Sequence, residues 1–412
     1  ARPVLNAAQQ GALVYADSLE IDLSGHSILQ EASRATGLHD FGPTDFLERL
    51  ELLCDEWGGD EGLTNLGRLS LRNKLVQHAR GRLLIQDVIT RHPEIHAIEI
   101  RSPIIVAGLP RSGTTHLLNV MAADARLRAL PLWESYEPVP LPGEQRLASG
   151  EDPRYQRCAD QWRMMQSLSP LLAAMHPMNP DHIHEELELM GPDFASYNYE
   201  WLSVSPRWRD HYYASDQTPH YEYMKTVLKI LTWQDGDCTG GNTRWVLKCP
   251  QHLEQLGVLR TVFPDATVAI THRDPVSVIQ SAVTMLAYGQ RVNRKKVDLD
   301  GLITYWTDRV VHLLQACVRD RAALPAGQSI DVPFHDFMAD DLGMVEKIYA
   351  RAELAMTAPA RRQLQTFIDT HPRGRDGRVV YNLRDDFGVT PAQLRARFAF
   401  YFDRFPVQVE VD

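Results

Sequence analysis

A short apolar run followed by a glycine-containing turn constrains the fold of this chain more than any other feature. The run Ile104–Ala107 is continuous and is bounded by turn-forming residues, a pattern typical of a strand buried on both faces of a parallel sheet. It is followed directly by Gly108-Leu-Pro-Arg-Ser-Gly-Thr-Thr115, and a helix is expected to begin near Thr115. Strand, turn and helix in this order begin a βαβ unit.

The same alternation returns later in the chain. Strands are expected at Trp245–Leu247 and Thr267–Thr271, each followed by a helical pattern, at His252–Phe263 and Val276–Tyr288 respectively. A further strand at Ser329–Val332 and a helix at Met344–Arg351 extend the alternation. These elements predict an α/β fold with a central parallel sheet, right-handed crossovers and helices on its faces.

The pattern of the rest of the chain predicts mostly helices. Apolar residues recur near a 3.6 period from Phe46 to Ile89, and His92-Pro93 ends that helical pattern. Glu134 to Gly150 is rich in proline and predicts an irregular connection, before a helical stretch that reaches Trp233. We expect a single domain over 1–412, with a helical N-terminal extension at 1–100, a sheet core at 101–412 and a helical insertion at about 150–240.

Composition excludes several classes of protein. The net charge of −10 disfavours a nonspecific binder of nucleic acid or of an anionic membrane. Binding of an anionic ligand therefore requires arginines that are placed at its site. The five cysteines are scattered without the spacing of a zinc site or a disulfide framework, which favours a reducing compartment. No signal-peptide pattern opens the sequence and no apolar run approaches the ~20 residues of a membrane span, so we expect a cytoplasmic protein.

The turn after the first strand has the composition of an anion-binding loop. Backbone N–H groups and a helix N-terminus point at an anion in this position, Gly113 permits its close approach, and Arg111 adds a permanent cation. Thr114 and Thr115 can donate hydroxyl hydrogen bonds. The loop has the G-x-x-x-x-G spacing of a nucleotide-binding P-loop, but Thr114 replaces the lysine that a kinase or ATPase requires. A tight turn with capping threonines is the alternative.

Three motifs together resemble the sulfotransferases that use 3′-phosphoadenosine 5′-phosphosulfate (PAPS). Pro110-Arg-Ser-Gly-Thr-Thr115 is similar to their 5′-phosphosulfate loop, particularly in the bacterial, mycobacterial-type branch, where arginine stands in place of lysine. Trp245–His252 resembles the family's second strand with its lysine, and Thr271–Pro275 with Ser281 resembles its 3′-phosphate motif. The implied cofactor-binding residues in these motifs are Pro110, Arg111, Ser112, Gly113, Thr114, Thr115, Arg273 and Ser281.

The resemblance implies a P-loop-containing fold and transfer of a sulfuryl group from PAPS to an acceptor hydroxyl, with adenosine 3′,5′-bisphosphate (PAP) as product and no metal. The acceptor is expected to be a small phenol, a carbohydrate or a glycolipid, and the pattern leaves this choice and the oligomeric state open. The other readings are a P-loop small-molecule kinase and a catalytically silent nucleotide-binding protein. The missing loop lysine argues against the kinase.

A second phosphate site is expected beyond the strand Thr267–Thr271. In the family an arginine and a serine eight positions later hold the 3′-phosphate, and Arg273 and Ser281 have that spacing. The alternative is a helix-capping aspartate with a surface salt bridge. Near the C-terminus the family places a basic, glycine-containing loop over the nucleotide, for which the candidates are Arg373, Arg375 and Gly377; a solvated basic loop is the other reading.

Sulfuryl transfer requires charge stabilisation on the leaving oxygen and a base for the acceptor proton. Arg111 is the candidate for the first task, with Lys248 as a second cation from the neighbouring strand. The family's histidine base is replaced by Pro250, so the base is sought in Asp181-His-Ile-His-Glu-Glu186.

The predicted bases, in order, are Glu185, Glu186 and His252. A carboxylate in an apolar site can have a pKa raised towards neutrality. A solvated acidic helix start and a metal site are the alternatives for the segment that holds the two glutamates. The aromatic residues at Trp133 and within Tyr197–Trp208 either line an acceptor pocket or belong to the core.

Overall fold

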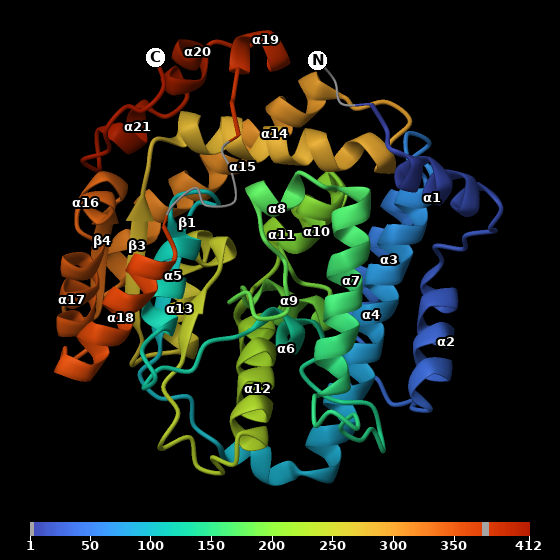
Figure 1. Ribbon diagram of the computed structural model, residues 1–412, viewed down its shortest axis with the longest axis horizontal. Helices are drawn as coiled ribbons and strands as arrows, with labels where there is room; N and C mark the ends of the chain where they lie inside the picture. Colours follow the sequence, from blue (N-terminus) through green and yellow to red (C-terminus); the bar gives the residue numbers. More distant parts are fainter. Residues whose placement is uncertain (1–3, 373–378) are drawn as a thin grey trace.

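The computed structural model describes residues 4–372 and 379–412 and is built around one parallel sheet. Its strands follow the order β2-β1-β3-β4, and each neighbouring pair is parallel. The strands are β1 (Ile104–Gly108), β2 (Val246–Lys248), β3 (Thr267–His272) and β4 (Ser329–Pro333). This architecture, with helices on both faces of the sheet (Figure 1), confirms the predicted fold class.

The helices fall into three groups along the chain. The N-terminal group is α1 (Ala7–Asp17), α2 (Gly25–Thr36), α3 (Phe46–Gly58) and α4 (Asn65–Arg91). Between β1 and β2 lie α5 (Thr114–Ala122), α6 (Leu132–Tyr136), α7 (Pro153–Leu168), α8 (Leu172–Met175), α9 (Leu187–Met190), α10 (Asn198–Leu202), α11 (Pro206–Ala214) and α12 (Thr218–Gln234). The third group is α13 (Leu256–Val262), α14 (Pro275–Asn293), α15 (Leu299–Asp320), α16 (Phe334–Ala339), α17 (Asp341–Arg351), α18 (Ala358–Thr370), α19 (Leu383–Phe387), α20 (Pro391–Ala396) and α21 (Ala399–Phe402).

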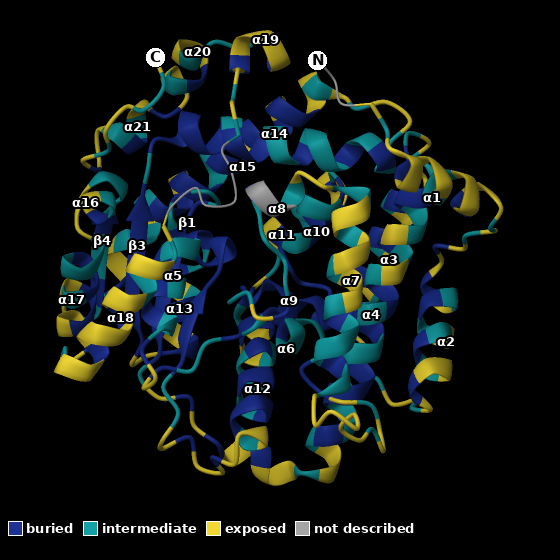
Figure 2. Cartoon of the chain, viewed as in Figure 1, coloured by how far each residue is buried: buried dark blue, intermediate teal, exposed yellow. Residues whose placement is uncertain are grey.

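The sheet separates two apolar cores because successive strand residues point to opposite faces. On β1, Ile104 and Val106 belong to the core with α5, α16 and α17, whereas Ile105 and Ala107 belong to the core with α12, α13, α14 and α15. All five residues of β1 are buried, and much of the sheet is coloured as buried in Figure 2. The continuous apolar run in the sequence therefore has the cause proposed for it, burial on both faces.

Two predicted helices are each divided in the structure. The pattern from Phe46 to Ile89 contains two helices, α3 and α4. The first helix ends at Gly58, and Thr64 caps α4 by accepting a hydrogen bond from the Gly67 N–H. The predicted helix His252–Phe263 is a 3-10 turn, η3 (Pro250–Glu254), followed by α13. The predicted strands agree with the structure to within one residue at each end, and α4 ends at Arg91, one residue before His92.

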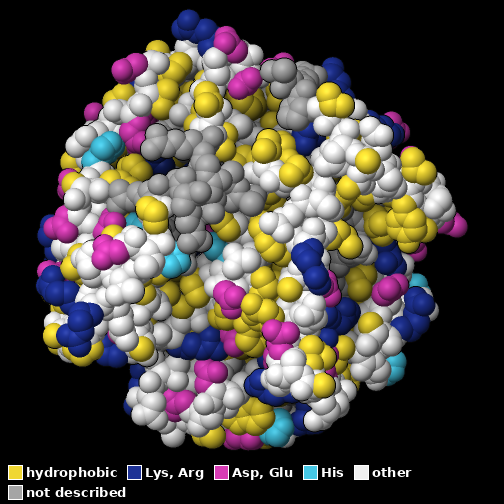
Figure 3. Space-filling view, in the orientation of Figure 1, with side chains coloured by type: hydrophobic (Ala, Val, Ile, Leu, Met, Phe, Trp, Pro, Cys, Tyr) yellow, Lys and Arg dark blue, Asp and Glu magenta, His cyan; other side chains and the backbone are white. Residues whose placement is uncertain are grey.

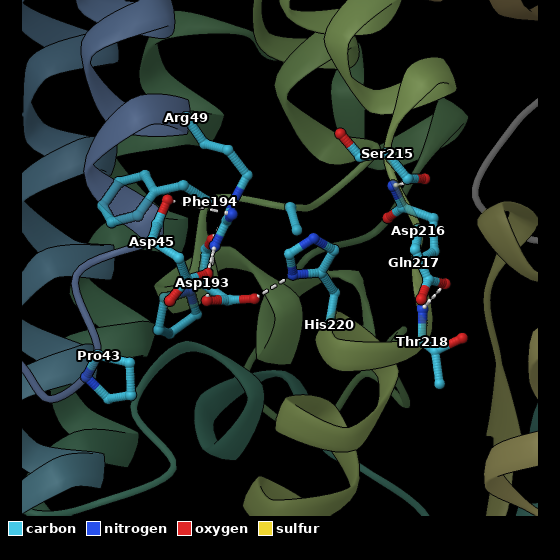
Figure 4. A network of polar contacts seen from close by, with 12 residues as sticks. Pro43, Asp45, Arg49, Asp193, Phe194, Ser215, Asp216, Gln217, Thr218 and His220 are labelled. Carbon is cyan, nitrogen blue, oxygen red and sulfur yellow. Dashed lines mark hydrogen bonds and ion pairs between the residues drawn. The ribbon is translucent and has the colours of Figure 1, made fainter.

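A buried carboxylate ties the N-terminal helices to the middle of the chain. Asp193 is 4% exposed and its Oδ1 accepts hydrogen bonds from Arg49 Nη2 on α3 at 3.0 Å and from Arg82 Nη1 on α4 at 2.9 Å. Its Oδ2 lies 2.5 Å from His220 Nδ1 on α12, and Figure 4 shows Asp193 between Arg49 and His220. Two consecutive N-terminal helices and the distant α12 are thus held by one side chain.

The described part of the chain contains no helix that is both long enough and apolar enough to cross a membrane. On the face drawn in Figure 3, basic and acidic side chains are interspersed over the surface.

We expect Asp193→Ala to lower the free energy of unfolding by about 3–5 kcal/mol, because it leaves the buried Arg82 without its carboxylate and Arg49 with only the more exposed Asp45. Urea unfolding followed by circular dichroism measures this change. The control is Asp210→Ala, which removes a carboxylate that is 66% exposed and should change stability by less than about 0.5 kcal/mol. Equal effects of the two substitutions would contradict the role given to Asp193.

Candidate active site

Three predicted site segments meet at one edge of the sheet. β1 pairs in parallel with β2 on one side and β3 on the other, so the carboxyl ends of all three strands lie together. The loop Leu109–Gly113 follows β1, Lys248 is the last residue of β2, and Arg273 follows β3. The sheet therefore places the loop predicted to bind an anion between two cations that lie far away in the sequence.

The loop after β1 is fixed by close packing. Ser112 Oγ donates to the Leu109 carbonyl at 2.5 Å and lies 2.7 Å from Thr271 Oγ1 on β3. A Cβ on Gly108 would lie 1.9 Å from that same Thr271 oxygen, so only glycine fits there. Gly113 has a φ of +84° and is the N-cap of α5, which places the free N–H groups of the helix at the loop.

Arg111 adopts an uncommon backbone conformation for a side-chain-bearing residue. Its φ is +66°, in the left-handed region, which costs free energy and persists only where the surroundings impose it. Its Nε donates to Ser281 Oγ at 3.0 Å and its Nη1 to the Met175 carbonyl at 2.7 Å, while its carbonyl accepts from Arg273 Nη1 at 2.6 Å. The guanidinium is thus held at the loop, beside the residues expected to bind phosphate.

Arg273 has an acidic partner that the sequence pattern did not indicate. Its Nε and Nη2 donate to the carboxylate of Glu410 at 2.9 and 2.7 Å, and Ser277 Oγ donates to the same carboxylate at 3.3 Å. The guanidinium carbon also lies 3.9 Å from the centre of the Phe334 ring. A carboxylate from the C-terminal segment therefore occupies the donors proposed for an anionic ligand.

Ser281 is near Arg111 rather than beside the donors of Arg273 that bind Glu410. Its Oγ accepts from Arg111 Nε and donates to the Tyr381 hydroxyl at 3.0 Å. The three residues predicted in the basic C-terminal loop, Arg373, Arg375 and Gly377, lie outside the described residues.

Lys248 and Glu185 form a buried ion pair beside the loop. The Lys248 ammonium contacts Glu185 Oε1 and donates to Thr115 Oγ1 at 3.3 Å, and the two charged side chains are 2% and 10% exposed. Burial raises the pKa of the Glu185 carboxyl, but Lys248, His184 and His176 outweigh it, so that the pKa lies below its ordinary value. The carboxylate is ionised at neutral pH, which differs from the raised pKa that an apolar setting alone would produce.

The two other candidate bases lie elsewhere. Glu186 is 0% exposed; its Oε1 accepts from the Lys248 N–H at 2.8 Å and its Oε2 lies 3.3 Å from His252 Nε2. His252 is also 0% exposed, and its Nδ1 lies 2.9 Å from the Tyr221 hydroxyl. Both side chains belong to a buried polar network that supports β2, and of the three candidates Glu185 alone lines the cavity described below.

A cluster of three imidazole rings lies beside Glu185. The ring centres of His176, His182 and His184 are 5.4 to 6.2 Å apart. Burial lowers the pKa of His184 to about 4 and of His182 to about 2, and it also lowers that of His176. These rings are therefore neutral at pH 7, and within residues 4–372 and 379–412 no group of histidines, cysteines and carboxylates has the arrangement to hold a metal ion.

One cavity of about 1180 Å³ joins the loop to the helical half of the molecule. Its lining includes Pro110, Arg111, Gly113, Thr114 and Thr115 from the loop, Arg273 from the sheet edge and Glu185 from the segment before α9. Side chains of α4, α7, α10 and α14 form much of the rest of its wall. The predicted loop residues that reach this cavity are thus joined to a carboxylate, a cationic edge and a helical chamber.

The parallel sheet and the glycine-containing loop before α5 define a P-loop-like α/β protein with cationic side chains at one edge of the sheet. A model of the sulfotransferase family matches residues 103–358, and the chain belongs to this family. No curated protein matches the chain.

Two solved bacterial structures are similar over nearly the whole chain. The sulfotransferase STF1 from Mycobacterium tuberculosis H37Rv is 29% identical, with a TM-score of 0.80 over 92% of this chain and 100% of that one. The sulfotransferase STF9 from Mycobacterium avium is 24% identical, with a TM-score of 0.82 over 96% of this chain and 99% of that one, and it supports the fold. The likeness to the bacterial branch of the family is thereby confirmed.

Several residues of the site left no signal in the sequence. Glu410 is isolated near the C-terminus, Met175 contributes only a backbone carbonyl, and His176 lies outside the acidic segment that drew attention to His182 and His184. Nothing in their local pattern marks them, because each reaches the site through tertiary packing.

We expect Lys248→Met to lower the free energy of unfolding by about 3–5 kcal/mol at pH 7, because Glu185 is left as a buried charge without its cation. In the wild type the pKa of Glu185 is depressed, so its stabilising contribution is complete above the unfolded pKa and is lost only as pH falls through the folded value. In the variant burial raises that pKa, so acidification from pH 7 to pH 5 should narrow the stability difference between the two proteins.

Urea unfolding at the two pH values measures this difference. The double variant Lys248→Met with Glu185→Gln, which has no buried carboxylate at this position, is the control and should show no such narrowing. A difference that stays constant between pH 7 and pH 5 in the single variant would rule out the coupling of these two charges.

Proposed function

We propose that this protein transfers a sulfuryl group from PAPS to the hydroxyl of an acceptor and releases PAP. The observation that supports it most directly is a single cavity that contains both the loop Pro110–Thr115 and the Glu185 carboxylate. An anionic donor and a hydroxyl acceptor could meet there. The matching family model and the presence of two fixed arginines at the loop are consistent with an anionic donor of this kind.

In the proposed reaction the chain's residues act on charge and on one proton. Arg111 and Lys248 stabilise the negative charge that develops on the 5′-phosphate oxygen as its bond to sulfur breaks. Glu185 accepts the proton from the acceptor hydroxyl as the new oxygen–sulfur bond forms. Because a sulfuryl group carries less negative charge than a phosphoryl group, cations of the protein can replace a metal ion in this task.

The loop backbone and Arg273 would bind the two ends of the nucleotide. The N–H groups at the start of α5 face the cavity and suit the 5′-phosphosulfate. Arg273 with Ser277, at present bonded to Glu410, suits the 3′-phosphate, and Ser281, which contacts Arg111, is the further residue proposed for it. We also propose that the acceptor is a small molecule, that the protein has no nucleic acid partner and that it is located in the cytoplasm.

Calorimetric titration with PAP and, separately, with ATP tests this function, each first with EDTA and then with magnesium. We expect metal-independent binding of PAP and much weaker binding of ATP. Arg111→Ala and Arg273→Ala should each weaken PAP binding by about tenfold or more, since each removes charge-assisted hydrogen bonds to phosphate. Glu185→Gln should leave PAP affinity nearly unchanged and abolish sulfuryl transfer from PAPS.

Magnesium-dependent binding of ATP alone would instead favour a kinase. A Glu185→Gln variant that transfers at the wild-type rate would overturn the assignment of the base. PAP binding with no transfer by the wild-type protein to any of a panel of phenols, sugars and alcohols would favour a silent nucleotide-binding protein.

We expect Glu410→Gln to strengthen PAP binding by about threefold to tenfold, because a neutral amide competes less well than a carboxylate for the Arg273 guanidinium. Titration of the wild type and the variant with PAP measures this. Two controls isolate the effect: AMP, which lacks the 3′-phosphate, should bind both proteins equally, and Asp412→Asn should behave as the wild type. Weaker PAP binding by Glu410→Gln would show that Glu410 orients Arg273 rather than competing for it.

A further inference from the structure

One basic side chain in the cavity wall stands apart from the others. Lys74, Arg80, Arg111 and Arg273 are the lysines and arginines of that wall among the described residues. Lys74 contacts Glu188 at 3.4 Å, and Arg111 and Arg273 have the partners given above. Arg80 has no hydrogen-bond or ion-pair partner within the described chain, and its Nε is buried without one.

No carboxylate of the described residues pairs with this arginine. The four glutamates of the same wall have other partners: Glu31 pairs with Arg72, Glu137 with Arg157, Glu185 with Lys248 and Glu188 with Lys74. A buried donor with no acceptor costs free energy, and a guanidinium group matches the two oxygens of a carboxylate. The arrangement suits an acidic group that comes from a ligand.

The lining of the cavity extends along α4. Leu66, Asn73, Gln77 and Arg80 line it at intervals of three, four or seven residues, which places them on one face of the helix. Leu66 and Arg80 are fourteen residues apart, or about 21 Å at 1.5 Å per residue. Lys74, between them, contacts Glu188, three residues from Glu185, so the segment that carries the proposed base crosses the helix between the two ends of this row.

The wall around this row is largely apolar. Its apolar side chains come from α7, much of which is exposed (Figure 2), and from α4, α8 and α14. They include Leu66, Val76, Met165, Leu168, Leu172, Met285, Leu286 and the largely exposed Met164. Methionine-rich walls of this kind accommodate flexible apolar groups of differing shape.

We propose that the acceptor is an elongated apolar hydroxyl compound that carries a carboxylate, which binds Arg80. This inference rests on the proposed function, and it narrows the acceptor to amphiphilic hydroxy acids. The apolar body lies against α4, α7 and α14, and Arg80 selects acids over neutral alcohols of the same length. Arg80 is a specificity-determining residue that lies apart from the loop and from Glu185.

The test compares octanoate and octanol, which share an alkyl chain and differ in charge, as ligands of the protein saturated with PAP. Calorimetry should show octanoate binding about tenfold or more tightly than octanol in the wild type. Arg80→Gln should abolish this preference and leave PAP affinity unchanged. Met165→Gln should weaken both ligands by similar factors, because it alters the wall that the alkyl chain contacts.

Arg91→Gln is the matched control, since Arg91 lies on the same helix, outside the cavity, in an exposed ion pair with Asp87. It should retain the preference for octanoate. Failure of octanoate to bind, equal binding of the two ligands by the wild type, or an unchanged preference in Arg80→Gln would overturn the inference. Failure of PAP to bind is a separate outcome that overturns the proposed function, and the two ligands are then compared without nucleotide.

Discussion

The parallel pairing of β1 with β2 and β3 is the constraint on which the site depends. Parallel strands end at the same edge, so the loop after β1, Lys248 and Arg273 meet although each comes from a different part of the chain. The two apolar cores on the faces of the sheet fix this register. Close packing at the edge then requires glycine at position 108 and holds Arg111 in a left-handed conformation.

The charged side chains of the site are paired with other groups of the protein itself. Lys248 is bound to Glu185, Arg273 to Glu410, and Arg111 to a carbonyl and a hydroxyl. A ligand anion must therefore displace these partners. Their presence lowers the free-energy cost of burying so many charged groups. Arg80 differs in this respect, and its difference is the basis for assigning it to the acceptor.

The helical half of the molecule forms the other side of the cavity. Asp193 joins α3, α4 and α12 through two arginines and a histidine, and so fixes the position of α4. One face of that helix then becomes the wall of the chamber. The stability of this buried network and the shape of the proposed acceptor chamber are therefore linked through a single helix.

The sequence by itself determined the strands, the loop and the family, because an apolar run before a glycine turn and the spacing around Lys248 and Arg273 are local patterns. Local patterns could not reveal that two predicted helices are divided, or that Glu410 binds Arg273. Nor could they separate the three candidate bases, since the sequence around Glu185, Glu186 and His252 does not show what each side chain contacts. Tertiary structure decided these points, because burial, charge pairing and the lining of a cavity depend on segments that meet only when the chain folds.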